Sequence, residues 1–401
     1  MLREIKKPNR DHARRLLQCL AVAIRPLRVE ELAEVLVVDF DDGSGIPTLK
    51  PSWRWEDQEQ ALLTSCSSLI TIVRPGDSRV VQFSHFSVKE FLTSTRLSTS
   101  SQDVSHYHIV LGPAHTILAQ SCLSILFRQD DFVEDSSVEK RSPLAGYAAE
   151  HWVRHAQFED VASRINGMEY IFDLDKPYFA AWRQLYDIDI DRPDSVFFQF
   201  TGSKSGANTP LYYAALCGFK DLVEQSIVKY PQHVNAIGGY YRTPALAALA
   251  GRHFEVAQVL HRNGSSIHLR GRDVFSPLLS AIHYGNLEMV QVLLNYGANV
   301  NNQDDYFYFS PFDYALQGYP NGTEVVRFLL DYGADLNARW KNGLTPLHRA
   351  SQYGKIEIVR TLVERGASVE VQDEQGRTPW DYALGEQRDE IIKLLLEHRA
   401  K

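Results

Sequence analysis

Hydrophobic positions in the second half of the chain repeat at a near-constant interval, and each repeat begins with the same kind of dipeptide. A Ser or Thr followed by Pro occurs six times there, at steps of 34, 33, 34, 35 and 33 residues. The six pairs are Thr209-Pro210, Thr243-Pro244, Ser276-Pro277, Ser310-Pro311, Thr345-Pro346 and Thr378-Pro379. The hydroxyl can cap the free N–H groups at a helix start, and proline fits the first turn, where no N–H is needed. The pattern therefore predicts six segments that each open with a helix.

The fullest copy predicts a pair of helices. Residues 335–350 read Asp-Leu-Asn-Ala-Arg-Trp-Lys-Asn-Gly-Leu-Thr-Pro-Leu-His-Arg-Ala. Gly354 is expected to end the first helix because glycine takes positive φ without steric cost. A second apolar face follows at Ile356, Ile358, Val359, Leu362 and Val363. One such pair cannot bury its apolar face alone, so neighbouring pairs are expected to stack.

This stretch resembles the ankyrin repeat, whose signature is a Thr-Pro-Leu-His-x-Ala core at a period of about 33 residues. The resemblance covers residues 204–401 as six repeats. It implies a helical solenoid in which the hairpin tips and the exposed side of the first helices form a groove that binds other proteins. His348 matches the histidine of the core, and its ring is expected to bond to Thr345, which is a structural role.

The first half of the chain predicts three helices followed by a β-hairpin, an order typical of a winged helix. The helices are expected at residues 11–24 with Asp11 as cap, 29–38 and 59–67, the hairpin strands at 69–73 and 80–83, and a further helix from Ser87. Winged helices often read DNA with the third helix. Here that helix starts with Glu56, Asp57 and Glu59 and has no Lys or Arg through Ser68, which argues against DNA reading.

Two stretches of this half, residues 24–32 (Ile-Arg-Pro-Leu-Arg-Val-Glu-Glu-Leu) and 83–92 (Phe-Ser-His-Phe-Ser-Val-Lys-Glu-Phe-Leu), resemble the winged helix that follows the NACHT domain in fungal NLR-like proteins. Such proteins commonly end in ankyrin repeats. Their nucleotide-binding core has no counterpart here, since no Gly-x4-Gly-Lys-Ser/Thr motif occurs and residues 202–206 have the wrong spacing. The resemblance implies the regulatory and sensing end of such a protein, either a shortened paralogue or an incomplete gene product.

Residues 101–200 are expected to be a helical spacer. Helices are predicted at 109–127, 143–156 and 179–185, with acidic breaks at 130–139 and 187–194. The predicted architecture is mainly α: a winged-helix-like domain (1–100), the spacer (101–200) and the ankyrin solenoid (204–401).

Composition narrows the partners. The chain has 42 basic and 50 acidic residues, and neither half has the basic excess that nucleic-acid binding needs. Its four cysteines are far apart in sequence, as expected for reduced, buried thiols in a cytoplasmic protein. No signal peptide or membrane-spanning stretch is visible, so neither a nucleic acid nor a membrane is an expected partner.

Side chains that carry chemistry form no convincing catalytic or metal site. His151 and His155 have a spacing that suits a metal, but Trp152 stands where a zinc protease has its Glu, and no third ligand is evident. We expect one of these histidines to pack beside Trp152 and the other to be exposed. His106 and His108 alternate, and residues 187–194 lack the Gly and closing Glu of a calcium loop. We therefore expect no enzyme activity, no cofactor and no metal.

His85 has two interpretations. By resemblance to NLR-like proteins, it matches a His that contacts the β-phosphate of ADP, a role that would here need a nucleotide-binding domain on another chain. The alternative is a local cap of the helix that starts near Ser87.

Two groups of residues are the candidates for partner binding. The first comprises aromatic residues near the predicted hairpin tips, and the second comprises residues four positions after the Ser/Thr on the first helices. Exposed aromatic and Arg side chains of this kind anchor interfaces. They are Tyr213, Tyr240, Tyr241, Tyr306, Phe307, Tyr308, Tyr314, Trp340 and Arg349. The predicted function is a non-catalytic module that binds a protein partner, as the recognition part of an NLR-like system. The alternative is a regulatory subunit acting in trans on a nucleotide-binding NTPase domain.

Overall fold

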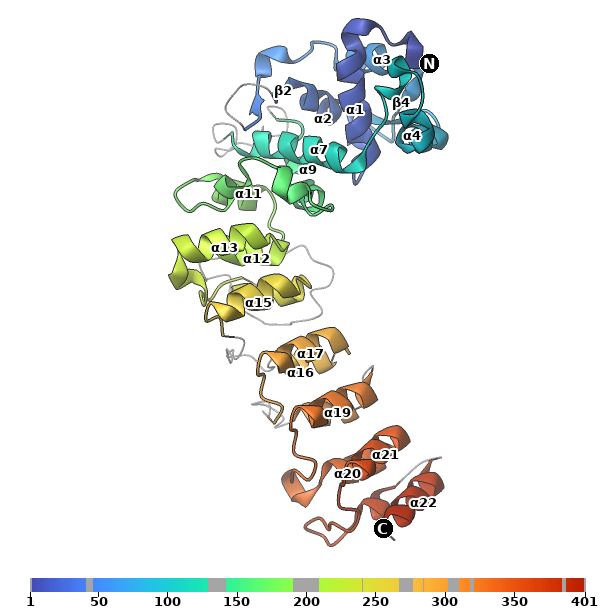
Figure 1. Cartoon of the computed structure of the whole chain (residues 1–401), viewed down its shortest axis with the longest axis vertical. Helices are drawn as coiled ribbons and strands as arrows, with labels where there is room; N and C mark the ends of the chain where they lie inside the picture. Colours follow the sequence, from blue (N-terminus) through green and yellow to red (C-terminus); the bar gives the residue numbers. More distant parts are fainter. Residues whose placement is uncertain are drawn as a thin grey trace. The chain divides into compact units, whose positions relative to one another are not determined.

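The computed structural model describes residues 2–40, 46–128, 142–189, 209–239, 241–266, 277–283, 285–301, 310–317, 321–383 and 387–399. Its contacts divide the chain into two compact units. Unit 1 comprises residues 1–192 with 217–226, and unit 2 comprises 193–216 with 227–401. Figure 1 labels many of the elements of each unit.

Unit 1 begins with the predicted winged helix. Helices α1 (Arg10–Val22), α2 (Val29–Glu34) and α3 (Gln58–Cys66) pack together beside a three-stranded antiparallel sheet. The sheet has the order β1 (Leu27–Arg28), β5 (Val80–Phe83), β4 (Ile70–Val73). Its register pairs Val81 with Leu27 on one side and with Ile72 on the other, and Val81 is buried. The fold class predicted for this half is confirmed.

Two details of the winged helix differ from prediction. The residue before α1 is Asn9, and Asp11 lies in the first turn, where its charge suits the helix dipole without capping it. The predicted helix at 29–38 ends at Glu34, and a 3-10 turn (Val35–Val37) leads into a strand, β2 (Val38–Asp39), which pairs with β3 (Thr48–Leu49). Three valines in four residues favour extended backbone over continued helix.

A helical layer continues unit 1 after the winged helix. Short helices α4 (Phe86–Thr93) and α5 (Thr95–Ser98) close the first hundred residues. Then α6 (Gln102–Ser105) leads into α7 (Leu111–Leu126), which packs against both α1 and α9 (Ala145–Ala156). A 3-10 turn (Val161–Arg164), α10 (Met168–Ile171) and α11 (Tyr178–Leu185) follow. The acidic breaks predicted at 130–139 and over most of 187–194 lie outside the described residues.

Aromatic residues form the centre of this helical layer. The indole of Trp152 is fully buried and meets the ring of Trp182 edge-on at 5.2 Å between centroids. The ring of Phe219, which belongs to the same unit, stacks on Trp152 at 5.7 Å. The Trp182 indole donates a hydrogen bond to the carbonyl oxygen of Ala149 at 2.9 Å, so its polar group is satisfied inside the core.

Paired helices in regular succession make up the repeats. Helices α12 (Pro210–Cys217) and α13 (Lys220–Lys229) contribute to both units, and the later pairs belong to unit 2. These are α14 (Pro244–Ala250) and α15 (Phe254–Arg262), α16 (Pro277–His283) and α17 (Leu287–Asn295), α18 (Pro311–Leu316) and α19 (Gly322–Asp331), α20 (Pro346–Gln352) and α21 (Ile356–Glu364), and the 3-10 turn Pro379–Tyr382 with α22 (Arg388–Arg399). From α16 onward, first helices pack on first helices and second helices on second helices, which confirms the predicted stacking.

Each predicted Ser/Thr-Pro start is a helix cap wherever the structure describes it. The Thr243 hydroxyl accepts from the N–H of Leu246 at 3.3 Å. Asp313 and Asp381 complete capping boxes with Ser310 and Thr378, respectively. In the fifth repeat, His348 has the same role beside Thr345. In the second repeat, Arg252 takes the left-handed conformation (φ 62°) that glycine usually supplies, at a strain of about 1 kcal/mol.

Asparagine side chains connect consecutive repeats at the loops that follow the second helices. Asn235 donates to the carbonyl oxygen of Gly264 at 2.9 Å and accepts from the N–H of Ser266 at 2.8 Å. Asn301 and Asn337 accept in the same way from Asp335 and Ser368, at 3.1 and 3.3 Å. Each amide satisfies backbone groups of the next repeat, which fixes the rise from one repeat to the next.

His348 has the structural role predicted for it. Its Nδ1 accepts from the N–H of Thr345 at 3.1 Å, so its Nε2–H donates to the carbonyl oxygen of Arg377, 3.1 Å away in the next repeat. We expect His348→Ala to reduce the free energy of unfolding by about 1–3 kcal/mol, because it leaves buried backbone groups unpaired. Urea unfolding, with hydrogen exchange of residues 345–352, measures the loss.

The chain supplies a matched variant, His348→Asp, because Asp313 and Asp381 occupy the same place in their repeats. Aspartate keeps the cap on Thr345 and loses only the bond to Arg377, so we expect a smaller loss than with alanine. Equal losses for the two variants would show that the cap contributes nothing.

Candidate partner-binding surface

Trp340 lies at the start of the hairpin that precedes the fifth repeat and is half-buried. Its N–H donates to the carbonyl oxygen of Leu344 at 2.9 Å, and its own carbonyl accepts from Gly343 at 3.0 Å. Gly343 has φ 76° and lies so close to the next hairpin that an added Cβ would come within 3.0 Å of the backbone nitrogen of Glu374. The hairpin is therefore held on both sides, and Trp340 is a partly exposed ring on a rigid support.

Arg349, on α20 of the same repeat, is half-buried and keeps donor capacity. Its Nη1 donates to Gln352 at 3.3 Å, and its buried Nε has no hydrogen-bond partner within the described residues. A buried, unpaired guanidinium N–H is costly, and a partner carboxylate or carbonyl would satisfy it.

Next to this repeat, the last hairpin holds a polar cluster that sequence reasoning missed. The carboxylate of Asp373 accepts from the Tyr382 hydroxyl at 2.6 Å, from the N–H of Arg377 at 2.8 Å and from its Nε at 3.0 Å. Asp373 is desolvated, yet these bonds hold the pKa of its carboxyl below its usual range. The Arg377 guanidinium lies 4.5 Å from the centroid of the Tyr382 ring. The spacing Asp-x-x-Gly-x-Thr-Pro at residues 373–379 was the available signal.

Three of the residues predicted to contact a partner are buried, so the prediction is wrong for them. Tyr213, Tyr241 and Tyr314 are 0%, 3% and 3% exposed, so their rings are core residues and cannot anchor a partner. The Tyr212 hydroxyl accepts from the N–H of Tyr241, and the His283 ring meets Tyr314 at 6.2 Å, which shows that adjacent chain covers these positions. Tyr240, Tyr306, Phe307 and Tyr308 lie outside the described residues. Of the candidates that the structure describes, Trp340 and Arg349 remain available for contact with a partner.

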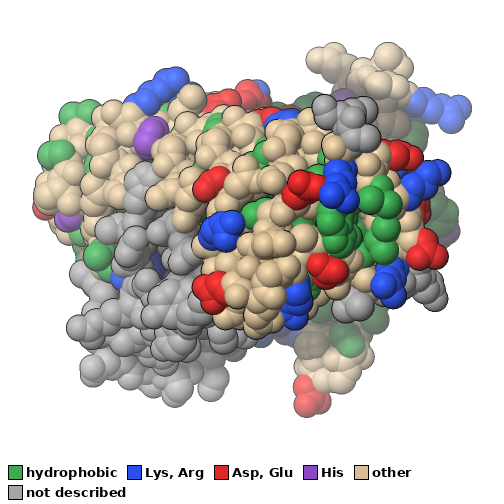
Figure 2. Space-filling view, turned by 90° about the horizontal axis from the view of Figure 1, so that it is seen from below, with side chains coloured by type: hydrophobic (Ala, Val, Ile, Leu, Met, Phe, Trp, Pro, Cys, Tyr) green, Lys and Arg blue, Asp and Glu red, His purple; other side chains and the backbone are tan. Residues whose placement is uncertain are grey.

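The described surface visible in Figure 2 carries basic and acidic side chains interspersed, with small groups of hydrophobic side chains between them. Charges of this kind pair across consecutive repeats: Arg365 lies 2.8 Å from Asp331, and Arg252 pairs with Glu288. Exposed pairs such as these contribute little stability, about 0–1 kcal/mol each.

His85 caps α4 locally. Its Nδ1 accepts from the N–H of Ser87 at 3.2 Å and lies 2.7 Å from the Ser87 hydroxyl, while its ring rests against Phe86 at 4.3 Å. This supports the capping interpretation. The acidic start of α3 also has a structural use, since the Glu59 carboxylate pairs with Arg74 and Arg79 of the hairpin, each at 3.0 Å.

The expectation of one packed and one exposed histidine on α9 is wrong, because His151 and His155 are 5% and 0% exposed. The Tyr147 hydroxyl accepts from the N–H of Ile24 at 3.1 Å and contacts His155 Nε2 at 2.8 Å, and His155 Nδ1 lies 2.8 Å from His115 Nδ1. Desolvation lowers the pKa of His155 to about 3. These groups form a hydrogen-bonded chain that joins α7, α9 and the segment that follows α1.

Within the described ranges, no group of three His, Cys, Asp or Glu side chains is arranged to hold a metal ion. All four cysteines are free and buried, and burial raises the pKa values of Cys19 and Cys66 to about 12. None of the described helices combines the length and apolarity needed to cross a bilayer.

Comparison with known families agrees with both halves of the fold. Three overlapping segments, residues 211–304, 244–340 and 312–401, match "Ankyrin repeats (3 copies)", and residues 2–102 match "GPI inositol-deacylase, winged helix domain". The chain is therefore an ankyrin-repeat protein with a winged helix domain at its N-terminal end.

Among individual proteins, the chain is similar to "Azaphilone pigments biosynthesis cluster protein L" of Monascus ruber, at 30% identity over 280 residues. That match covers 64% of this chain and 56% of the relative. Rabankyrin-5 of Mus musculus is 31% identical over 36% of the chain and 12% of its own length, and the ankyrin repeat protein nuc-2 of Neurospora crassa is 29% identical over 37% and 14%. The chain thus spans about half the length of the first relative and a small part of the others.

Proposed function

We propose that this chain is a non-catalytic module whose ankyrin repeats bind a protein partner. The observation that carries the proposal is the regular stacking of α16, α18 and α20, together with the hydrogen-bonded hairpin of residues 340–344 that precedes α20. A stacked array holds such a hairpin rigidly, so little conformational entropy is lost on binding. Trp340 supplies a large, partly exposed ring and Arg349 an unsatisfied donor.

The proposed setting is recognition or autoinhibition in an NLR-like, NACHT-type system in the cytoplasm. The order of winged helix and ankyrin repeats supports the system. Four free, buried thiols support the compartment, because reducing conditions keep cysteines unpaired.

Capture experiments test the proposal. The whole chain serves as bait, and captured proteins are identified by mass spectrometry. We expect Trp340→Ala, alone and with Tyr308→Ala, to weaken capture of a specific partner by about 2 kcal/mol or more, as for an interface anchor. Trp53→Ala is the matched control, because Trp53 is 51% exposed and lies in the winged helix. If Trp340→Ala and Trp53→Ala capture the partner equally well while both remain folded, the partner binds elsewhere on the chain.

A second candidate function is regulation in trans of a nucleotide-binding NTPase domain. It is favoured by the apolar surface of α4, where Phe86 is 71% and Phe91 42% exposed beside a 410 Å³ hollow lined by Leu69, Val88 and Phe91. A separately produced NACHT domain, mixed with this chain, gives the test. Unchanged nucleotide retention after His85→Ala would exclude the phosphate-contact role of His85, and retention unchanged by the whole chain would exclude this function.

A further inference from the structure

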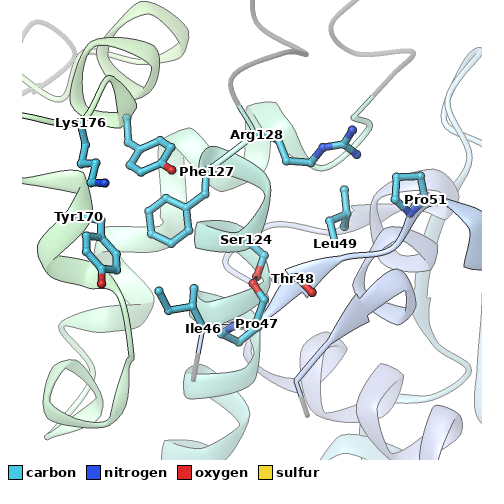
Figure 3. A pocket seen from close by; sticks show the side chains of 11 residues that line it. Ile46, Pro47, Thr48, Leu49, Pro51, Ser124, Phe127, Arg128, Tyr170 and Lys176 are labelled. Carbon is cyan, nitrogen blue, oxygen red and sulfur yellow. Dashed lines mark hydrogen bonds between the residues drawn. The ribbon is translucent and has the colours of Figure 1, made fainter. Parts of the chain in front are cut away.

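Unit 1 contains a hollow of about 510 Å³ that none of the roles above uses. Figure 3 shows it between the β2–β3 hairpin and the helical spacer. One wall comes from the strand β3 and its neighbours, including Thr48 and Leu49, and the other from the end of α7 and the segment 170–178. Its size lies within the range of small-molecule sites, about 300–1,000 Å³.

Aromatic rings line the spacer side of the hollow. The ring of Phe127 lies 4.8 Å from that of Tyr178 and 6.4 Å from that of Tyr170, measured between centroids. Leu49 and three further apolar residues, Ile46, Pro47 and Pro51, complete the apolar part of the lining. Such walls favour a flat or chain-like apolar body, which would bury against them on leaving water.

Among the described residues, the charged side chains that line the hollow have one sign. Lys176 and Arg128 are among its eleven lining residues, and no Asp or Glu is, although acidic residues outnumber basic ones in the chain by 50 to 42. The Lys176 ammonium lies 5.8 Å from the centroid of the Tyr170 ring and forms no ion pair with any described residue. Lys176 is exposed at the edge of the hollow, so it can pair with the anionic group of a ligand while water partly screens the attraction.

Two residues at the hollow carry hydroxyl groups: one hydroxyl links the two walls, and the other lacks a hydrogen-bond partner among the described residues. The Ser124 hydroxyl lies 2.7 Å from the carbonyl oxygen of Pro47 and 2.8 Å from that of Gln120, and so ties the hairpin to α7. Thr48 lines the same hollow, and its Oγ1 is buried with no hydrogen-bond partner within the described residues. A buried hydroxyl left unpaired costs free energy that a polar group of a ligand would recover.

We propose that this hollow binds an amphipathic organic anion, an aromatic or acyl body that carries one carboxylate or sulfonate. The apolar body lies against Phe127, Tyr170 and Leu49, the anionic group pairs with Lys176, and Thr48 Oγ1 bonds a polar group on the body. The proposal does not depend on what the repeats bind.

Two dyes of the same shape test it on the whole chain. The probe 1-anilinonaphthalene-8-sulfonate is anionic, and N-phenyl-1-naphthylamine is the same ring system without the charge. We expect Lys176→Gln to weaken binding of the sulfonate about threefold to fivefold and to leave the uncharged dye unchanged, because only one probe loses an exposed ion pair. Lys6→Gln, an exposed lysine of the same unit, is the matched control and should change neither.

Filling the hollow separates this site from adventitious dye binding. Leu49→Trp should abolish binding of both dyes at this site, and dodecanoate should displace the sulfonate from the unaltered chain. Near-ultraviolet circular dichroism checks that Leu49→Trp is folded. If that variant does not fold, Phe127→Ala takes its place: it removes part of a wall without filling the space and should weaken the binding of both dyes. Equal effects of Lys176→Gln on both dyes, or dye binding that survives all three substitutions, would overturn the proposal.

Discussion

Replacing Trp152 with alanine is expected to lower the free energy of unfolding of unit 1 by about 3–5 kcal/mol, the range for a buried aromatic residue reduced to alanine. The side chain is 0% exposed and contacts the rings of Trp182, Phe172 and Phe219, at centroid distances of 5.2, 6.1 and 5.7 Å. Trp152 and these three rings come from four separate segments, so the cavity left behind cannot close by the shift of one helix. A loss of this size is comparable with the whole stability of many domains.

Hydrogen exchange is the suitable measurement, because a chain with two compact units need not unfold in one step. Amides of α7 and α9 should exchange faster in Trp152→Ala, at a rate that reports the lost free energy. Trp53→Ala removes the same side chain from a position that is 51% exposed and should change exchange little. A similar, small effect of both substitutions would mean that the aromatic cluster does not hold the helical layer together.

Acidification from pH 7 to pH 5 is expected to destabilise unit 1 by about 2 kcal/mol through His155 alone. Burial lowers the pKa of this ring to about 3 in the folded chain, so it stays neutral there, whereas in the unfolded chain it binds a proton below about pH 6.5. The unfolded state thus holds more protons, and stability falls as pH falls through 6.5. Desolvation also lowers the pKa values of His115 and His151, which adds to the loss.

The hydrogen-bonded chain gives this effect a geometric cause. Tyr147 accepts from the N–H of Ile24 and donates to His155 Nε2, so His155 donates from Nδ1 to His115. A proton added to His155 Nε2 would make this nitrogen a donor that faces the donating hydroxyl of Tyr147. Charged groups around the three rings are Lys89 near His115, Arg154 near His155, and Arg25, Glu31, Glu150 and Arg154 near His151.

Urea unfolding at pH 7, 6 and 5, followed by exchange of α7 and α9, measures the dependence. His155→Gln is expected to be less stable at pH 7 but to lose less stability on acidification. Tyr147→Phe keeps the ring and the titrating histidines, so it should keep most of the pH dependence while losing about 1–3 kcal/mol throughout. Identical pH slopes for His155→Gln and the unaltered chain would exclude His155 as the source.

Much of the fold was predictable because local rules dominate in this chain. The Ser/Thr-Pro pairs combine a cap with a proline, and their spacing leaves room for only one helix pair per repeat. The order of helices and hairpin strands in the first half likewise follows from periodicity and turn residues. Predictions failed where a local pattern was ambiguous, as at Val35–Val38, where valines suit both a buried helix and a strand.

The candidate site was predictable only in part. An aromatic residue after a Ser/Thr-Pro pair has the same sequence signature whether its ring faces a partner or a neighbouring helix, and for Tyr213 and Tyr314 the neighbouring chain covers it. The same holds for His151 and His155, which share a spacing with metal ligands and are used instead for a bond between helices.

By itself the sequence determined the repeat, the caps and the winged helix, because these depend on residues within a few positions of one another. Only the tertiary structure decided which aromatic rings are buried, which cation lies at an apolar hollow and which histidine joins α7 to α9. Those outcomes depend on segments far apart in the chain, such as Ile24 with Tyr147 or Pro47 with Ser124, and no local pattern encodes such distances.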